Sequence, residues 1–571
     1  MRADHTLTAG GGGGLGARLL APPLLAMLVL LGASCAKEVA KPSEPRLPTE
    51  PAVPDYITDT VGEKVRFIGR DYIAVQGYGF VTGLDGTGST IVPPGVRQQV
   101  LFIMRQHKVE NPEALMASRD TAVITVGGMI PPGATKGEAF DLELRVLPGT
   151  DATSLEGGFL LECDLTRVAI GRTGELRSQP MALARGDIFV GLSNPESGAP
   201  AADPRIGRIL AGGRTIEARR FRLILTDPSV RAVDQIIRQI NARFPGVAKG
   251  TRDARVDLTV PDQYQDDKTH FLDLVGAIYL REMPAARDAR VKLLIDQLEQ
   301  GKDMDRAAIY LEAFGGTVIP QLRNLADHPN ESVRFYVGRI LAFLQDGLGQ
   351  RVLEPIALND SSEYQEAAVR ALGEMRRGLG LTTLSMALDA RSARVRIAAW
   401  RAIRKVSPAA TVVAAFPDRF TLSAVPSKGP PFVYVSRSLE REIAVFGDVR
   451  IQPPALARTQ RVMATASPGA KALTIIAGSH DQNARLDVPL DLVQAIRLMA
   501  SPVTKEGSQE ITGLDLNYSQ IVAVLYQLAE KKALTGPMVL QPLQYYVPGG
   551  GPIAAPPGPA AESDAAESAP E

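Results

Sequence analysis

A short glycine-rich segment contains the residues that come closest to a recognisable chemistry. Residues 83–90 read Gly-Leu-Asp-Gly-Thr-Gly-Ser-Thr, which nearly fits the loop that cradles the phosphates of a nucleotide. In that loop a lysine precedes the last hydroxyl residue and supplies the positive charge for the β- and γ-phosphates. Ser89 occupies the lysine position here, and Pro93 and Pro94 follow, so no clear helix is expected after the loop. We therefore interpret the segment as a tight turn between strands, and nucleotide-dependent catalysis stays an alternative hypothesis.

A second glycine pattern, Gly77-Tyr78-Gly79, begins like a dinucleotide-binding fingerprint. Its third glycine would fall at position 82, where Thr82 stands instead. Tight turns often need a positive φ, which glycine adopts at little cost. We therefore expect the run to be structurally essential, and we expect valine in place of Gly79 or Gly86 to impair folding or assembly. The glycines of this run are Gly77, Gly79, Gly83, Gly86 and Gly88.

The other polar residues show no catalytic or metal-binding pattern. The histidines lack a paired spacing such as HxxxH, and no GxSxG nucleophile motif is present. Asp262, Asp266 and Asp267 cluster beside Lys268, which predicts a loop, with a cation site as the alternative. We therefore expect no enzyme activity, no catalytic residues, no cofactor and no metal.

The two cysteines have different settings. Cys163 lies in the alternating run from Phe159 to Ile170, which predicts a packed strand residue. Cys35 ends the sequence Leu-Gly-Ala-Ser-Cys, which resembles a bacterial lipobox. A positive start and the apolar run 19–31 precede it, and that run is shorter than the roughly 20 residues of a membrane span. We predict a lipoprotein-type signal peptide at 1–34, lipidation of Cys35 and outer-membrane sorting, with an ordinary secretory signal as the alternative.

Composition excludes several classes of protein. The chain has 571 residues, with 63 Lys and Arg against 63 Asp and Glu, so a globally basic nucleic-acid binder is not expected. At roughly 100–200 residues per domain, this length suggests about three to five domains. Prolines recur every three residues in 35–59, which predicts an extended tether. Residues 548–571 contain acids but no bases, which predicts a disordered tail.

The elements that position the glycine run are strands. Residues 121–126, 138–147 and 159–170 alternate apolar and polar side chains. One helix is predicted after Asp227 as its cap, with Pro228 in its first turn. The runs 221–225 and 255–260 flank it as a β-α-β unit. Residues 60–284 therefore form a mixed α and β region.

Several of these motifs, in this order, resemble the flagellar basal-body P-ring family. The motifs are 76–88 (QGYGFVTGLDGTG), 121–133 (TAVITVGGMIPPG), 151–164 (DATSLEGGFLLECD) and 179–191 (QPMALARGDIFVG). The resemblance returns at 442–457 (EIAVFGDVRIQPPALA) and at 514–540, where an apolar stripe predicts a closing helix stopped by Gly536-Pro537. The resemblance implies a ring-forming structural protein without a cofactor.

Between these halves lies a helical segment that the family does not normally carry. Residues 285–416 repeat with Arg339, Arg370 and Arg401 at equal intervals of 31 residues. The pattern resembles HEAT-type helical hairpins, which stack into a solenoid that usually binds a protein partner. The arginines are candidates for that surface, although we favour solvation or pairing with acids of the same repeat. Trp400 is expected in the core.

The predicted fold class is α+β multidomain, a mixed strand-rich P-ring-like body split by an all-α HEAT-like insert. The body comprises 60–284 and 417–547, and the insert comprises 285–416. The resemblance implies a homo-oligomeric periplasmic ring around the flagellar rod, with rod and L-ring proteins as partners and peptidoglycan as a possible one. Lipid at Cys35 would add the outer membrane. The alternative is an outer-membrane-anchored adaptor that binds envelope proteins through its repeats and is unrelated to flagella.

Overall fold

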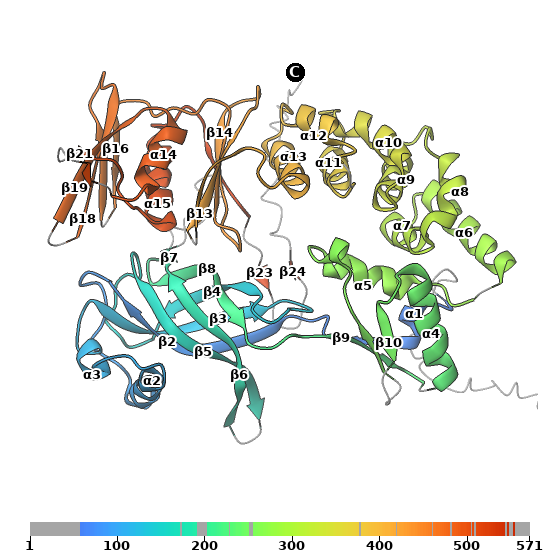
Figure 1. The fold of residues 1–571 in the computed structure, drawn as a ribbon, viewed down its shortest axis with the longest axis horizontal. Coiled ribbons are helices and arrows are strands. Elements are labelled where there is room, and N and C mark those ends of the chain that lie inside the picture. The colour runs from blue at the N-terminus through green and yellow to red at the C-terminus, as the bar shows by residue number, and fades with distance from the viewer. Residues whose placement is uncertain are drawn as a thin grey trace, which may run out of the picture. The chain divides into compact units, whose positions relative to one another are not determined.

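The structure is a computed structural model (Figure 1). It describes residues 58–171, 174–190, 203–227, 229–250, 255–281, 283–375, 378–417, 419–459, 461–479, 482–503, 505–506, 510–542, 545–546 and 552–553. The predicted signal peptide and Cys35 lie outside these residues, as do nearly all of the tether and of the acidic tail.

The first strand-rich region is a barrel. Its strands are β2 (Ile73–Thr82), β3 (Thr121–Ile130), β4 (Ala139–Val146), β5 (Phe159–Gly171), β6 (Gly174–Asp187), β7 (Phe189–Val190) and β8 (Ile206–Thr215). The order is β4-β3-β2-β5-β6-β8-β7, and β4 also pairs with β8, so six strands close on themselves. Closure removes the open edges that a flat sheet would expose. The three alternating runs predicted as strands are therefore confirmed as β3, β4 and β5.

Two helices lie beside the barrel, and the first corrects a prediction. Helix α2 (Pro94–Gln106) begins at Pro94 with Pro93 as its N-cap, and α3 (Pro112–Leu115) follows. The expectation that the two prolines prevent a helix is wrong. Proline is favourable in the first turn, because the amide hydrogen that it lacks has no helical partner there.

A second sheet contains β1 (Val65–Ile68), β9 (Phe221–Leu225), β11 (Arg255–Leu258) and β10 (Ala248–Gly250), in that order and all antiparallel. The helices α1 (Val61–Lys64), α4 (Val230–Arg243) and α5 (Lys268–Ala277) share its buried apolar cluster. The predicted β-α-β unit therefore has an extra strand, β10, which turns β11 antiparallel to β9. Ser229 rather than Asp227 is the N-cap of α4, since Ser229 is still extended; Pro228 lies outside the described residues.

The helical segment contains α6 (Pro284–Glu299), α7 (Met304–Ala313), α8 (Ile319–Arg323), α9 (Glu331–Phe343), α10 (Gly347–Ala357), α11 (Gln365–Gly373), α12 (Leu381–Ala387) and α13 (Ala393–Val406). Helix α9 packs against α10 and α11, and α11 packs against α13. Each unit thus buries its apolar face against its neighbours, as in a solenoid. The last helix ends at Val406, before the predicted end of the helical segment at residue 416, because β12 (Val412–Phe416) already pairs with β13 (Phe420–Val425) in a sheet.

That five-stranded sheet has the order β12-β13-β15-β14-β22, with β14 (Phe432–Val435), β15 (Glu442–Phe446) and β22 (Met538–Leu540). A four-stranded sheet follows, with β16 (Ala455–Arg458), β17 (Val462–Ala466), β18 (Ala472–Ser479) and β19 (Gln482–Pro489). The helices α14 (Leu492–Ala500) and α15 (Tyr518–Glu530) share one apolar cluster with both sheets.

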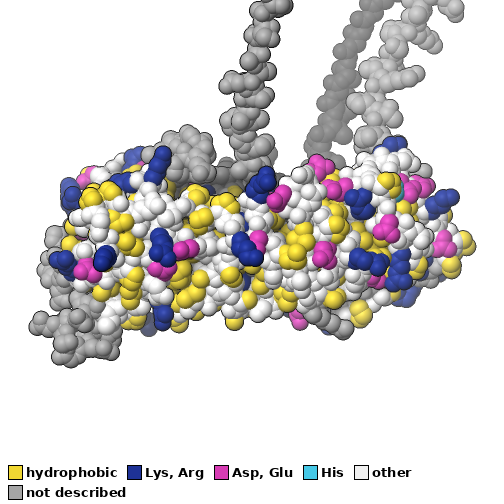
Figure 2. All heavy atoms as spheres, turned by 90° about the horizontal axis from the view of Figure 1, so that it is seen from above, with side chains coloured by type: hydrophobic (Ala, Val, Ile, Leu, Met, Phe, Trp, Pro, Cys, Tyr) yellow, Lys and Arg dark blue, Asp and Glu magenta, His cyan; other side chains and the backbone are white. Residues whose placement is uncertain are grey.

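The predicted closing helix is α15, which begins at a capping box formed by Asn517 and Gln520. It ends at Glu530, six residues before the Gly536-Pro537 pair expected to stop it. Among the described residues, none of the helices has the length and apolarity that crossing a bilayer requires. Figure 2 shows a face on which basic, acidic and apolar side chains are interspersed.

Candidate functional site

The glycine run divides into a strand part and a turn part. Gly77 and Gly79 lie inside β2, where β5 carries one residue more than β2 between the pairs Gln76–Thr166 and Val81–Leu160. A Cβ on Gly77 would lie 2.3 Å from the carbonyl oxygen of Asp164. These two glycines therefore permit the close approach of a bulged strand, and the predicted turn with positive φ does not include them.

The turn comprises Gly83, Gly86 and Gly88. Gly83 has a φ of +78° and Gly86 a φ of +85°, so these two fit the predicted turn chemistry. Gly88 has another reason to be glycine, since a Cβ there would lie 2.1 Å from the carbonyl oxygen of Thr121. Thus only part of the run depends on backbone conformation.

The amides of this turn are already used within the protein. The amide of Leu84 donates to the carbonyl of Asp120 at 2.9 Å, and the amide of Thr87 donates to the carbonyl of Leu84 at 3.0 Å. Gly86 donates to the Asp120 carboxylate at 2.8 Å. The amides of Gly88 and Ser89 donate to main-chain carbonyls at 2.8 Å. A phosphate-binding loop needs free amides directed at its ligand, so this geometry does not support nucleotide binding.

Ser89, in the lysine position of the phosphate loop, links the turn to the segment 151–158. Its buried hydroxyl donates to Asp151 Oδ1 at 2.5 Å, and this hydrogen bond lowers the pKa of the Asp151 carboxyl. The amide of Thr153 donates to the carbonyl of Thr87 at 2.9 Å. Two of the sequence motifs therefore form one substructure.

Arg461 connects this substructure to the second half of the chain. It lies between β16 and β17, and its Nε donates to Asp85 Oδ2 at 2.6 Å. Its Nη2 donates to the carbonyl oxygen of Gly83 at 2.9 Å. A Cβ on Gly157 would lie 3.5 Å from the same Nε, so the guanidinium also lies against the 151–158 segment. The glycine turn thus binds the side chain of Arg461 of the same chain.

Three further contacts join the two halves. The Asp141 carboxylate accepts the amide of Leu439 at 2.9 Å and that of Ala211 at 2.8 Å, while burial raises the pKa of this carboxyl despite these bonds. Arg441 Nη2 donates to the carbonyl of Leu210 at 3.0 Å, and Ser519 Oγ donates to the carbonyl of Ile188 at 3.0 Å. Sequence reasoning missed Arg461 and Asp141, because neither belongs to a local pattern.

The three arginines of the repeats are separate, and each has its own contacts. Arg339 Nη1, on α9, donates to Asp305 of α7 at 2.9 Å, and Arg370 pairs with Glu366 one turn earlier. Arg401 Nη2 donates to the hydroxyl of Tyr434 at 2.5 Å. Each of the three has a partner within this chain, Arg370 and Arg401 remain exposed, and Arg401 contacts the next sheet rather than its own repeat.

Polar contacts between helical units recur at about one repeat. Glu331 accepts from Ser362 Oγ at 2.6 Å, and Glu374 accepts from Lys405 Nζ at 2.7 Å, each across 31 residues. Gln345 Nε2 donates to the carbonyl of Glu374 at 2.9 Å across 29 residues. These bonds support the stacking of one unit on the next.

The last helix of the segment is fixed to the five-stranded sheet. Trp400 is fully buried, as expected, and its ring lies edge-on to Tyr434 and Phe446. Arg396 lies over the ring of Phe432, with 4.6 Å from its guanidinium carbon to the ring centroid. Arg404 pairs with the buried carboxylate of Glu442. The helical segment therefore ends in a packed junction.

Its first part is fixed to α5 by a buried pair. His270 Nε2 lies 2.9 Å from Oε1 of Glu312, whose side chain is 3% exposed. The ring of His270 lies on that of Phe343, with 4.6 Å between the centroids. Burial lowers the pKa of His270, but the hydrogen bond to Glu312 and the charges of Glu312 and Asp267 outweigh it, so the net shift is upward.

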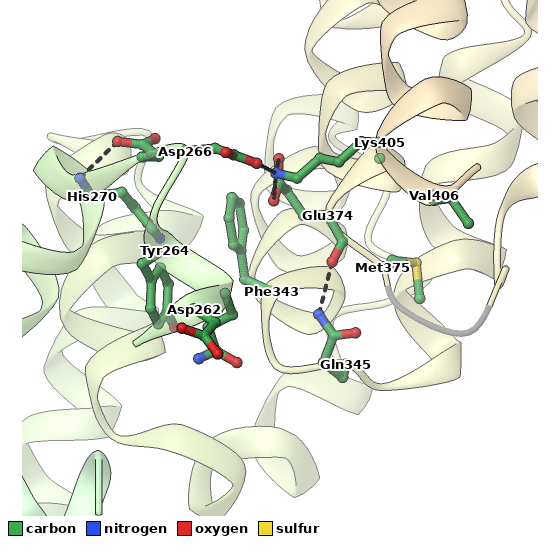
Figure 3. A pocket seen from close by; sticks show the side chains of 13 residues that line it. Asp262, Tyr264, Asp266, His270, Phe343, Gln345, Glu374, Met375, Lys405 and Val406 are labelled. Carbon is green, nitrogen blue, oxygen red and sulfur yellow. Dashed lines mark hydrogen bonds and ion pairs between the residues drawn. The ribbon is translucent and has the colours of Figure 1, made fainter. Parts of the chain in front are cut away.

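A cavity of about 380 Å³ lies between the segment 262–270 and the ends of α9, α11 and α13 (Figure 3). It contains the acids singled out in the sequence. Asp267 caps α5 by accepting the amide of His270 at 2.9 Å, and Asp266 lies 3.6 Å from Lys405 Nζ. Within the residues that the structure describes, no three His, Cys, Asp or Glu side chains are placed to hold a metal ion. The predicted loop is only partly right, because Asp262 lies in a short 3-10 helix (Asp262–Tyr264) and Lys268 is the first residue of α5.

Cys163 is buried in β5, inside the barrel core. Burial, together with the neighbouring Asp164 and Glu162, raises the pKa of this thiol to about 12. A thiol that stays protonated and buried is a poor nucleophile, so the prediction of a packed strand residue agrees with its environment.

Residues 61–297 are similar to known proteins. Residues 61–297 match the family model described as Flagellar P-ring protein. The Flagellar P-ring protein of Thermotoga maritima is 29% identical over 242 residues, covering 40% of this chain and 69% of that protein. The Flagellar P-ring protein of Caulobacter vibrioides is 30% identical over 213 residues, covering 35% and 54%. Flagellar P-ring protein 1 of Chromobacterium violaceum is 30% identical over 199 residues, covering 32% and 51%.

Proposed function

From the match of residues 61–297 to the family model described as Flagellar P-ring protein, we propose that the chain is a structural component of the flagellar basal body. In this role, many copies assemble into a periplasmic ring around the rod. The observation that carries the proposal is the family match, which covers the barrel together with the sheet of β1, β9, β10 and β11.

The site supports a structural role through what its polar groups do. The turn amides, Ser89 and Asp85 all bond to other parts of this chain. A ring needs identical subunits whose head-to-tail contacts close, and each subunit must present the same rigid surface. A glycine turn that receives Arg461 gives such rigidity by joining sequence-distant halves. No step of this role requires a cofactor.

The test is assembly in the source cells. Detergent-extracted basal bodies are isolated and their proteins quantified by mass spectrometry. Enrichment of this chain with rod and hook proteins supports the proposal, and loss of motility on deletion, restored by the wild-type gene, supports it further. Absence from basal bodies, with recovery in the outer-membrane fraction, would contradict it and would favour the adaptor.

We further propose that the protein is anchored in the outer membrane and contacts other proteins of the basal body. The lipobox-like Cys35 supports attachment to the outer membrane by an N-terminal lipid. Mass spectrometry of the intact mature protein tests this, since an acylated Cys35 adds the mass of its lipid and Cys35→Ala abolishes processing. Rod and L-ring proteins are the proposed ring partners, with peptidoglycan as a possible one.

We assign the helical segment the role of a structural bridge inside each subunit. His270 and Glu312 fix one part of it, and the α13 arginines fix its end. Arg339, Arg370 and Arg401 each contact this chain, although Arg370 and Arg401 stay exposed, so the arginines do not separate this role from the adaptor. The match over residues 61–297 favours the ring component, with the helical segment as a built-in spacer.

A further inference from the structure

The sheet of β1, β9, β11 and β10 has one covered face and one open face. Its inward side chains, such as Leu223 and Val256, are buried with α4 and α5. The strand registers place the outward residues in two rows, with Ile224 between Arg66 and Arg255 in one. In the other row, Arg222 and Asp257 lie between Ile68 and Lys249.

Among the residues that the structure describes on its four strands, this open face, which we call the basic face, carries four cations and one carboxylate. The cations are Arg66, Arg222, Lys249 and Arg255. Arg222 pairs with Asp257 at 2.8 Å, while Arg66 and Lys249 are exposed and form no ion pair with any described residue. Ile68 is 38% exposed among them. The balance of charge therefore favours an anionic partner with some apolar character.

The chain itself contains a matching segment. After Lys532 the sequence has no Lys, Arg or His, and its acids are Glu562, Asp564, Glu567 and Glu571. Alanine and proline surround them. Before this segment, just after β22, Gln541 is anchored, since its side chain accepts the amide of Arg437 at 2.9 Å. The 20 residues between Gln541 and Glu562 can span about 65 Å when extended.

We propose that the basic face binds the acidic segment 562–571 of the same chain. Individual ion pairs between exposed groups are weak and are screened by salt. Tethering raises the effective concentration of the segment, so several weak pairs suffice for binding. Bound in this way, the segment would cover the basic face and compete with any other anionic partner. This inference is independent of the proposed ring.

Carbodiimide cross-linking of the full-length protein tests the proposal, because it joins a carboxylate to an amine only when they are in contact. The expected product links Lys249 to an acid of 562–571, identified by mass spectrometry. Its yield should fall about threefold or more in 0.5 M NaCl and in Arg66→Gln, since both weaken the ionic contact. The matched control is Arg458→Gln/Arg485→Gln, which removes two exposed cations from the β16–β19 sheet and should leave the yield unchanged.

Isotope mixing and a second readout complete the test. Links confined to one isotopic species support binding within a chain, whereas links mainly between labelled and unlabelled chains would show a second copy as the occupant and overturn the proposal. Independently, a fluorescent peptide of residues 558–571 is titrated into full-length protein whose four acids are replaced by amides. Binding that Arg66→Gln weakens supports the proposal. The proposal would be overturned if the peptide bound equally well with and without Arg66→Gln, or if the segment were linked to all lysines alike.

Discussion

The contacts that join the barrel region to the C-terminal half and the contacts within the helical segment span very different sequence distances. In the barrel, Arg461 reaches Asp85 across 376 residues, and the amide of Leu439 reaches Asp141 across 298. In the helical segment, Glu331 and Ser362 bond across 31 residues, as do Glu374 and Lys405. The helices can therefore form from neighbouring units, whereas the contacts of Arg461 and Leu439 with the barrel region form only after the C-terminal half is present.

Tryptophan fluorescence reports unfolding locally, because Trp400 is the only tryptophan of the chain and lies in α13. Its fluorescence reports the helical segment and the sheet behind it. Circular dichroism reports all elements. A variant that destabilises the barrel should therefore shift the urea transition seen by circular dichroism away from the transition seen by Trp400 fluorescence. A variant of α13 should destabilise the sheet that Trp400 contacts.

The largest effect is expected from valine in place of Gly88. Its Cβ would lie 2.1 Å from the carbonyl oxygen of Thr121 and 2.5 Å from that of Arg119, and main-chain atoms cannot rotate away. We expect a loss of at least about 4 kcal/mol in the free energy of unfolding of the barrel. Urea unfolding followed by circular dichroism measures it.

Gly95→Val is the matched control, because nothing lies within 4 Å of the Cβ position there. Gly79→Val should have a smaller effect than Gly88→Val, since the atoms that it meets, on Leu160 and Val126, belong to side chains that can rotate. Equal stability of Gly88→Val and Gly95→Val would show that the turn does not require glycine at this position.

Trp400→Ala tests the junction of α13 with the five-stranded sheet. The side chain is fully buried, and its Nε1 donates to Thr411 Oγ1 at 2.9 Å. Truncation should cost about 3–5 kcal/mol. Thermal unfolding followed by circular dichroism is the measurement, with Trp400→Phe as the conservative variant. A loss below 1 kcal/mol would mean that the junction contributes little to stability.

Arg461→Ala tests the link across the barrel. It removes two hydrogen bonds, one of them to a carboxylate, from a side chain that is 28% exposed. We expect a loss of about 1–2 kcal/mol, and the urea transitions seen by fluorescence and by circular dichroism should separate. Asp85→Asn is the partner for a double-mutant cycle, because asparagine tolerates the positive φ of Asp85. Additive losses would exclude coupling.

The sequence predicts what depends on neighbouring residues. Alternating side chains predict β3, β4 and β5, and a buried stripe predicts α15, because each pattern arises within one element. The start of α4 is displaced, since Ser229 competes with Asp227 as the cap and both residue types suit that position.

The candidate site was predicted only in part, because a sequence pattern shows features within one element but not contacts between distant elements. The glycines of the turn are visible in the sequence, and so is a conformational reason for two of them. Their partner Arg461 is not visible, because a contact across 376 residues leaves no periodic pattern. The closeness of Gly77 to Asp164 is equally hidden, since it depends on how β5 bulges against β2.

A pH dependence of stability is expected from the buried pair at the start of the helical segment. The pKa of His270 is raised above its ordinary value of 6.5 in the folded protein. Its pair with Glu312 therefore stabilises the fold fully below the unfolded pKa, and this contribution is lost as pH rises through the folded pKa. The measurement is the difference in unfolding free energy between the wild type and His270→Gln from pH 5 to 9. We expect that difference to shrink with rising pH, and a constant difference would show that the pair is not ionic.

The smallest effect is expected within the repeats themselves. Arg370 pairs with Glu366 one turn away, and its side chain is 70% exposed, so Arg370→Ala should change the unfolding free energy by no more than about 0.5 kcal/mol. Arg339→Ala should cost more, about 1 kcal/mol, because its side chain is only 22% exposed and lies over the ring of Tyr336. Urea unfolding followed by Trp400 fluorescence measures both. If Arg370→Ala is instead the more damaging variant, contacts within one helix outweigh those between units, and the solenoid description of this segment loses its energetic basis.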